Sequence, residues 1–174
     1  FSMSGTMLNL GRLADAVSLH EHCEVICAAD PEYGAGITGF NVYGYLLSTH
    51  GVALTYQGRP LDGLRLVERA TEIARERRDH EIVVVANSAG FITCEMLGDA
   101  AGALAYAREG MRGVEAGADG LRQTALLHLG RAHLMQGEWS VASDALVASL
   151  DTTRRVRTGL AHEAAVLAFL ADAH

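Results

Sequence analysis

The feature that most constrains the fold is a segment that occurs three times, with copies about 40 residues apart. Each copy has an apolar stretch, then a glycine, then a second apolar stretch, and the glycines are Gly58, Gly98 and Gly137. A small residue follows five positions after each glycine, and an apolar residue follows four positions later. A period of this length is typical of proteins built from repeated helix pairs, in which each unit packs on its neighbours.

Each repeated position has a physical role in a pair of helices. A glycine can end the first helix in a left-handed conformation that a side chain would strain. The small residues, which are Gly63, Ala103 and Ala142, let the second helix approach the first closely. One helix pair cannot bury its apolar face alone, so the units must stack. The sequence therefore predicts an all-α protein.

The composition favours helices and excludes some classes of partner. The chain has 2 prolines, 6% aromatic residues and a net charge of −7, and each of its 14 basic residues is arginine. No basic stripe is present, so we expect no nucleic-acid partner. No apolar run reaches the ~20 residues that a membrane span needs, so we expect no membrane partner. The 3 cysteines do not form a disulfide framework, which favours a cytoplasmic protein.

We expect a single domain over residues 1–174, with about eight helices divided into stacked units. The predicted units are 1–28, 38–78, 80–116, 119–156 and a partial unit at 159–174. The predicted helices are 12–28, 38–57, 61–78, 80–97, 99–116, 119–136, 138–156 and 159–174. Residues 1–9 are expected to be the tail of a preceding helix, and 30–36 a loop. Because the last unit is incomplete, we expect the chain to be a fragment of a longer protein.

The third copy is the best match to a known repeat. Its matching positions are Leu129, Gly130, His133, Gly137, Glu138, Trp139, Ala142 and Leu146. In this pattern the chain resembles the tetratricopeptide repeat, although its period is longer. His133 stands where that family usually has tyrosine, and Ser149 stands in place of a late alanine. The resemblance implies a right-handed superhelix of antiparallel helix pairs, which is a solenoid of tetratricopeptide type.

Two phrases narrow the resemblance further, namely GRPLDGLRLVERATEIARERRD and LGRAHLMQGEWSVASDAL. They are similar to the divergent repeats in the C-terminal parts of large bacterial regulators. Those include LuxR-type ATP-binding transcriptional activators and proteins that join an adenylate cyclase domain to an AAA-type ATPase. Both phrases are especially similar to the repeats of the proteins that join an adenylate cyclase domain to an AAA-type ATPase.

The resemblance also implies where a partner would bind. In tetratricopeptide folds the first helix of each pair lines a concave groove. The same register here selects Tyr45, Ser48, Val52, Thr55, Val85, Ser88, Ile92, Glu95, Thr124, Leu127, Arg131 and Leu134. This set is mostly apolar and lacks a basic clamp, so we expect an apolar peptide, a helix or another domain of the same polypeptide as partner. The apolar helix at 159–174 further predicts a homodimer contact.

Residues 20–27, which read HEHCEVIC, leave two interpretations open. On a helix, His20, Cys23 and Cys27 share one face, as the ligands of a zinc site would. The repeat favours the other interpretation, because its register assigns His20 and Cys23 to inner positions that a second helix buries. The sequence GAGITG at 34–39 matches a dinucleotide-binding pattern, but no predicted strand precedes it, so it predicts a turn.

Three hypotheses about function follow. We favour a non-catalytic protein-interaction module within a larger bacterial signalling or transcriptional regulator. A free-standing adaptor protein is the second hypothesis. A metal-binding enzyme domain that uses His20, Cys23 and Cys27 is the third. The favoured hypothesis requires no cofactor, no metal and no catalytic residue.

Overall fold

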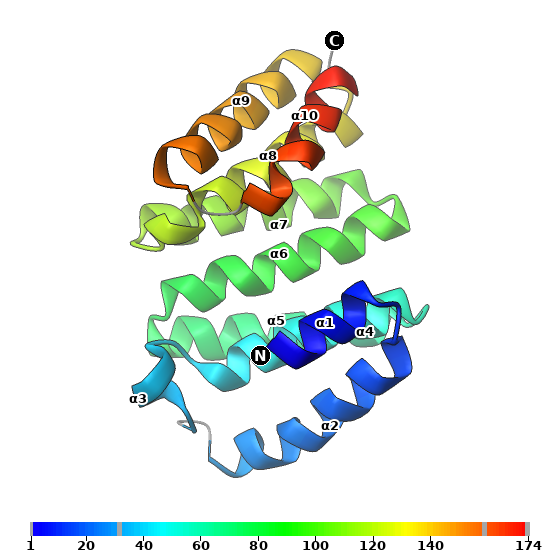
Figure 1. The fold of residues 1–174 in the computed structure, drawn as a ribbon, viewed down its shortest axis with the longest axis vertical. Helices are drawn as coiled ribbons and strands as arrows, with labels where there is room; N and C mark the ends of the chain where they lie inside the picture. Colours follow the sequence, from blue (N-terminus) through cyan, green and yellow to red (C-terminus); the bar gives the residue numbers. More distant parts are fainter. Residues whose placement is uncertain (1, 31–32, 158–159, 173–174) are drawn as a thin grey trace.

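The computed structural model describes residues 2–30, 33–157 and 160–172, which form helices and turns without a strand. The prediction of an all-α fold is confirmed. The helices are α1 (Ser2–Asn9), α2 (Leu13–Ala29), α3 (Ala35–Thr38), α4 (Val42–Tyr56), α5 (Pro60–Arg77), α6 (His80–Leu97), α7 (Ala100–Glu115), α8 (Arg122–Met135), α9 (Trp139–Val156) and α10 (Glu163–Asp172). Short 3₁₀ helices at Asp119–Leu121 and Leu160–His162 precede α8 and α10. Figure 1 shows the helices stacked from α2 at one end to α9 and α10 at the other.

Most helix boundaries lie within a few residues of the predicted ones, but the region between α2 and α4 differs. The prediction placed a loop at 30–36, whereas the structure has the one-turn helix α3 at Ala35–Thr38. The next helix also begins later than predicted, at Val42, because the Asn41 side chain accepts a hydrogen bond from a backbone N–H of the first turn. With α1 and α3 as separate elements, the described residues hold ten α-helices rather than about eight.

The repeated glycines adopt the predicted left-handed conformation. The φ angles of Gly58, Gly98 and Gly137 are +82°, +71° and +74°. These glycines end α4, α6 and α8, and each turns the chain back into the following helix, as Figure 1 shows. The GAGITG pattern also forms turns, since Gly34 and Gly39 flank α3 with φ angles of +77° and +81°.

Close contact within the helix pairs depends on glycines in the first helix. A Cβ atom built on Gly51 in α4 would lie 3.1 Å from the side chain of Val67 in α5. A Cβ atom built on Gly130 in α8 would lie 2.6 Å from the side chain of Leu146 in α9. A Cβ atom on Gly51 would also lie 2.8 Å from the backbone carbonyl oxygen of Gly63, so glycine at both positions lets the second helix approach the first closely.

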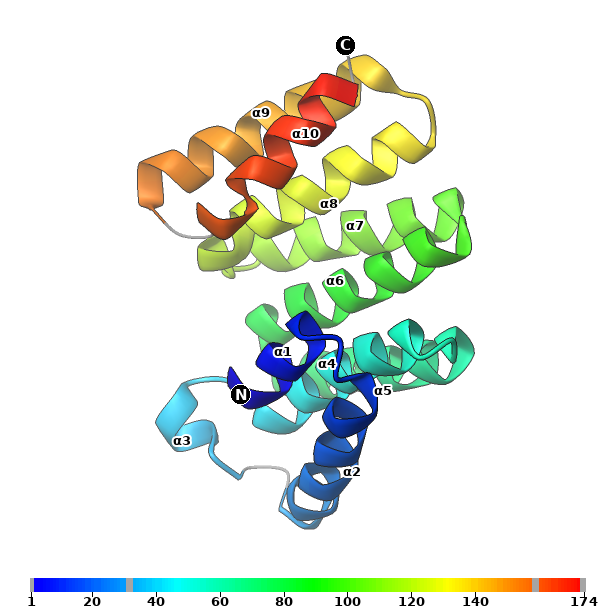
Figure 2. The same cartoon turned by 45° about the vertical axis from the view of Figure 1, so that its right-hand side comes forward.

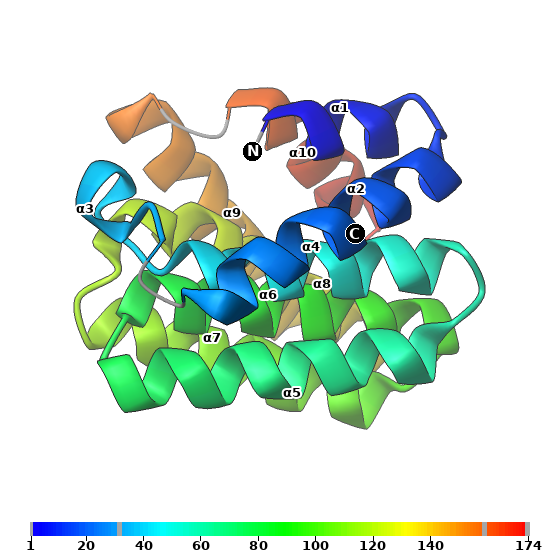
Figure 3. The same cartoon turned by 90° about the horizontal axis from the view of Figure 1, so that it is seen from below.

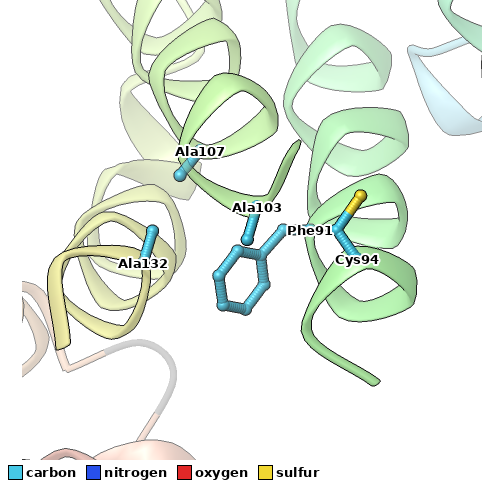
Figure 4. Close-up of a cluster of buried hydrophobic side chains, with 5 residues drawn as sticks. All are labelled: Phe91, Cys94, Ala103, Ala107 and Ala132. Atoms are coloured by element: carbon cyan, nitrogen blue, oxygen red, sulfur yellow. The ribbon is translucent and has the colours of Figure 1, made fainter. Parts of the chain in front are cut away.

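The central pair, α6 and α7, also has such a glycine, because a Cβ atom on Gly90 would clash with the ring of Tyr106 in α7, but it differs at one position. The large residue, Phe91, belongs to the first helix and is completely buried. It packs against Ala103 and Ala107 of α7 and Ala132 of α8, and Figure 4 shows its ring directed away from α6 toward them. The large and small side chains are therefore exchanged at this one position, where the other two pairs have Gly51 and Gly130.

The helix pairs form layers. Helices α4 and α6 are in contact, as are α6 and α8, and α2 packs on α4. In Figure 3, α5 lies along one edge of the molecule while α1 and α10 lie along the opposite edge. Figures 1 and 2 both show α1 beside α4 and α10 beside α8, with α6 between them. In the described ranges, no helix combines the length and the apolar character that a membrane span requires.

Candidate functional site

Helix α6 leaves one narrow face accessible. Between Ile82 and Glu95, the residues that are not buried are Val85, Ser88, Ile92 and Glu95, which we call the α6 stripe. Their spacing of three and four residues places them on one side of the helix. All four belong to the predicted groove set. The face combines two apolar side chains with one hydroxyl and one carboxylate, which suits a contact with another apolar surface.

Helix α4 presents a different face from the predicted one. Tyr45 and Val52 are half-buried as expected, but Ser48 and Thr55 are only 1% and 2% exposed. The accessible positions of α4 are one residue further along, at Thr49 and Tyr56.

The reason for this shift lies in how closely α4 is packed. The Ser48 hydroxyl donates to the carbonyl of Gly44, and the hydroxyl oxygens of Thr55 and Thr93 are 2.9 Å apart across the contact between α4 and α6. A Cβ atom built on Gly44 would lie 2.7 Å from the side chain of Ile82. The stripe of small residues in α4 therefore forms the helix contact, and it rotates Ser48 and Thr55 inward.

Helix α8 supplies the remaining predicted groove residues. Thr124, Arg131 and Leu134 are half-buried, whereas Leu127 is 4% exposed and packs in a cluster with Val166 of α10. Leu127 therefore contacts another part of the chain instead of a free surface.

Arg131 joins α6, α8 and α10. Its guanidinium group pairs with the carboxylate of Glu95. The guanidinium carbon lies 5.1 Å from the ring centroid of Phe91 and 4.8 Å from that of Phe169. Both distances fit a cation–π contact. The charge of Arg131 is thus matched within the chain, and α10 docks on α8 partly through this residue.

A second candidate site is an apolar pocket between α2 and α4, with a volume of about 270 Å³. From α2 it is lined by Leu19, His20, Cys23, Ile26 and Cys27. The other lining residues are Tyr33, Val42, Tyr45, Leu46 and Thr49. We call it the α2–α4 pocket. None of these ten residues is an aspartate, glutamate, lysine or arginine, so the pocket favours an uncharged occupant.

Two stacked histidines form one side of this region. The rings of His20 and His50 are 5.3 Å apart, centroid to centroid, and nearly parallel at 12°. Burial, and then the nearby His50, lower the pKa of His20 to about 4. Burial also lowers the pKa of His50, and this outweighs the opposite effect of Glu24, whose carboxylate oxygen is 3.4 Å from His50 Nδ1. Both imidazoles are therefore neutral at pH 7.

Neither ring nitrogen of His20 has a hydrogen-bond partner among the protein atoms, and the same is true of His50 Nε2, whereas His50 Nδ1 faces Glu24. A buried polar atom without a partner costs on the order of 1–3 kcal/mol, so such groups call for an explanation. Sequence reasoning placed His20 on the inner face, and its exposure of 1% confirms that. It did not find His50, because the two histidines meet only through the packing of α2 on α4.

The cysteines of HEHCEVIC lie along the same pocket. Cys27 is buried and Cys23 half-buried, and both are free thiols. Burial raises the pKa of Cys27, so its thiol is protonated at pH 7. Within the described residues, no group of three histidine, cysteine or acidic side chains is arranged to hold a metal ion. The arrangement of His20, Cys23 and Cys27 is that of a packed helix face.

A comparison with known proteins adds no relative, since no family model and no curated protein matches the chain.

Proposed function

We propose that the chain is a non-catalytic module of tetratricopeptide type, whose helix pairs form a right-handed superhelix. Its function in this proposal is to bind a protein or peptide along the α6 stripe. The observation that supports it best is the accessibility of α6. A helix that contacts neighbours on both sides keeps one regular face accessible, and two of the four side chains on that face, Val85 and Ile92, are apolar.

The chemistry of the stripe favours a helical or extended apolar partner. Val85 and Ile92 supply apolar area, and Ser88 between them leaves room for a partner side chain. The α6 stripe itself has no basic residue, and the neighbouring Arg131 is already paired with Glu95. The stripe therefore offers no free cation to recognise an acidic peptide. An amphipathic helix that places anchors three and four residues apart matches this spacing.

Helix α10 is an intramolecular example of the same kind of contact. It lies against α8, with Val166 buried beside Leu127 and Phe169 stacked on Arg131. A partner helix on the α6 stripe would lie next to it. We propose that the partner is another domain of the same polypeptide or a separate protein, within a bacterial signalling or transcriptional regulator, as the resemblance implies.

The predicted homodimer contact at 159–174 is also a proposal. Residues 159, 173 and 174 lie outside the described residues. Within the described part, Leu160 and Leu167 are 49% and 46% exposed, which provides apolar area for self-association. Sedimentation equilibrium of the chain and of a Leu167→Glu variant measures this directly. A dimer that the variant weakens supports the contact, and a monomer at all concentrations contradicts it.

Photo-crosslinking in the source cell tests the binding function. A photoreactive amino acid at Ser88 should form a covalent adduct with a specific protein, because that position lies in the middle of the α6 stripe. The matched control places the same amino acid at Ala105, an exposed position of α7. An adduct that forms equally from Ala105, or from neither position, would contradict the proposal.

A further inference from the structure

The α2–α4 pocket has no role in the proposed protein-binding function. Helix α4 separates it from α6, the helix that carries the α6 stripe. We propose that it binds a small, uncharged and mostly apolar molecule that carries one hydroxyl or carbonyl group. This inference goes beyond the protein-binding function and does not depend on it.

The volume of the pocket limits the size of the occupant. At about 270 Å³, it holds a molecule on the order of ten non-hydrogen atoms. That is too little for a helix or a folded domain.

The lining determines the polarity of the occupant. The walls are formed by aliphatic side chains, two tyrosines, two thiols and one threonine hydroxyl. The Thr49 hydroxyl already lies 3.1 Å from the backbone carbonyl of Tyr45, to which it donates. Moving an ion into such surroundings would cost far more than the contacts return, so a charged group is excluded. A neutral apolar molecule would gain the burial of its own surface and that of the walls.

The rim is suited to capture such a molecule. Ile26 and Tyr33 both line the pocket, and they are 46% and 57% exposed. Large apolar side chains in these positions are in contact with water. Binding would remove part of this surface from water, which is the main source of affinity for an apolar ligand.

His20 provides the polar anchor. It lines the pocket, is 1% exposed, and has no hydrogen-bond partner for either ring nitrogen. A neutral imidazole offers one donor and one acceptor, so a hydroxyl can satisfy either nitrogen and a carbonyl can satisfy the donor. The ring of His50 stacks on the imidazole and holds its orientation. Both ring nitrogens are shielded from solvent, so a ligand that displaces a shielding side chain and pairs with His20 removes the cost of an unpaired buried group.

The test uses 1-naphthol and naphthalene as probes, which share a ring system and differ by one hydroxyl. Each is titrated into the purified chain, with binding followed by probe fluorescence and by heteronuclear NMR of the protein. We expect saturable binding of both probes, with chemical-shift changes confined to residues of the α2–α4 pocket. We also expect 1-naphthol to bind about five- to tenfold more tightly than naphthalene, as one added hydrogen bond predicts.

A matched pair of variants locates the site. Cys23→Phe places a ring inside the pocket, and we expect it to weaken both probes at least ~tenfold by filling the space. Val25→Phe adds the same ring on the same helix at a position that is 73% exposed and outside the pocket, and we expect no change. Circular dichroism confirms that both variants are folded. If the two variants bind alike, or if the wild-type chain binds neither probe, the pocket is not a ligand site.

A second pair of variants tests the anchor. His20→Phe keeps a flat ring but removes the ring nitrogens, so it should remove the preference for 1-naphthol and leave naphthalene affinity unchanged. The control is His128→Phe, which alters another buried histidine that stacks on a phenylalanine far from the pocket. An equal loss for both probes in His20→Phe would show that the imidazole only packs, which would overturn its assignment as anchor. These outcomes are separate from crosslinking at Ser88, because that experiment concerns a different helix.

Discussion

The contact between α2 and α4 and the contacts around α6 differ in how completely they are filled. Around α6, the Phe91 ring is fully buried against three alanines. Between α2 and α4 there is a pocket of about 270 Å³ and a pair of stacked imidazoles, of which His20 has no hydrogen-bond partner. The two regions use the same kind of helix but not the same kind of connection.

The connections explain the difference. Helix α6 passes into α7 through a turn centred on Gly98, which holds the two helices at one fixed distance. Helix α2 reaches α4 through residues 30–41, which include the one-turn helix α3. A short turn leaves little freedom for the helices to move apart, whereas a long connection imposes no such distance. Complementary side chains can then close the first interface completely but not the second.

The largest predicted effect is a loss of stability from a substitution in the closely packed cluster around Phe91. Phe91→Ala should lower the free energy of unfolding by about 3–5 kcal/mol, because it opens a cavity among small residues that cannot move in to fill it. Leu46→Ala, at a half-buried position that lines the α2–α4 pocket, should cost less than half as much. Urea denaturation of both variants measures the difference. Equal losses would mean that the two regions are packed alike.

Acidification should weaken the fold through the buried histidines. The pKa of His20 is lowered to about 4, and burial, then Arg131, lower that of His128 to about 3. The unfolded chain binds protons at these sites below about pH 6.5, while the folded chain does not, so stability falls as the pH falls. Each histidine contributes a loss of about 1.5 kcal/mol between pH 6.5 and pH 5.

Denaturation at several pH values checks this sign and its assignment to residues. His128→Leu should remove its share of the pH dependence and flatten the curve in this window. A variant of an exposed histidine, His22→Leu, should leave the slope unchanged. Stability that rises on acidification from pH 6.5 would contradict the account.

Replacing a cysteine with leucine in each region compares how much free volume the two regions have. Cys94→Leu should destabilise the protein by about 1–3 kcal/mol, because Cys94 is buried in the filled cluster with Phe91. Cys23→Leu should be neutral or stabilise by up to about 1 kcal/mol, because the added carbons extend into the α2–α4 pocket. Thermal and urea denaturation measure both. A loss of stability for Cys23→Leu as large as that for Cys94→Leu would show that the pocket has no free volume.

The smallest predicted effect is the cost in stability of replacing a left-handed glycine, and it should be the same around α6 and between α2 and α4. Gly98 ends α6, and Gly39 follows α3, and both have left-handed backbones with no atom near an added Cβ. Replacing either glycine with alanine should cost about 1 kcal/mol, because the strain is local and does not depend on packing. Chemical denaturation of Gly98→Ala and Gly39→Ala checks this. Unequal costs would mean that backbone strain contributes to the difference between the regions.

The central repeats were largely predictable from the sequence, since their restraints are local. The glycine turns and the small residues Gly63, Ala103 and Ala142 lie where the pattern predicted, and these three are buried. The α6 stripe coincides with the predicted groove positions on that helix. On α4 the same register predicted Ser48 and Thr55 to be accessible, whereas the accessible residues follow one position later. The small residues of α4 are arranged differently from those of the other copies and turn another face of the helix inward.

The region around α2 was less predictable, since its contacts join residues far apart in the sequence. Nothing local indicates that His20 would stack on His50, because 30–41 can connect α2 to α4 in many ways. The helix α3 and the start of α4 at Asn41 depend on turn and cap chemistry within that segment. The α2–α4 pocket follows from these unpredicted contacts, so no sequence signal reveals it.

The most direct test of the proposed function is the affinity of the crosslinked partner for two matched variants. Ser88→Glu places a charge in the middle of the α6 stripe, and Ala105→Glu places the same charge on an exposed position of α7. Isothermal titration calorimetry should show at least ~tenfold weaker binding for Ser88→Glu, since a carboxylate must lose water to enter an apolar contact. The affinity of Ala105→Glu should equal that of the unmodified chain. Equal affinities for both variants would contradict binding at the α6 stripe.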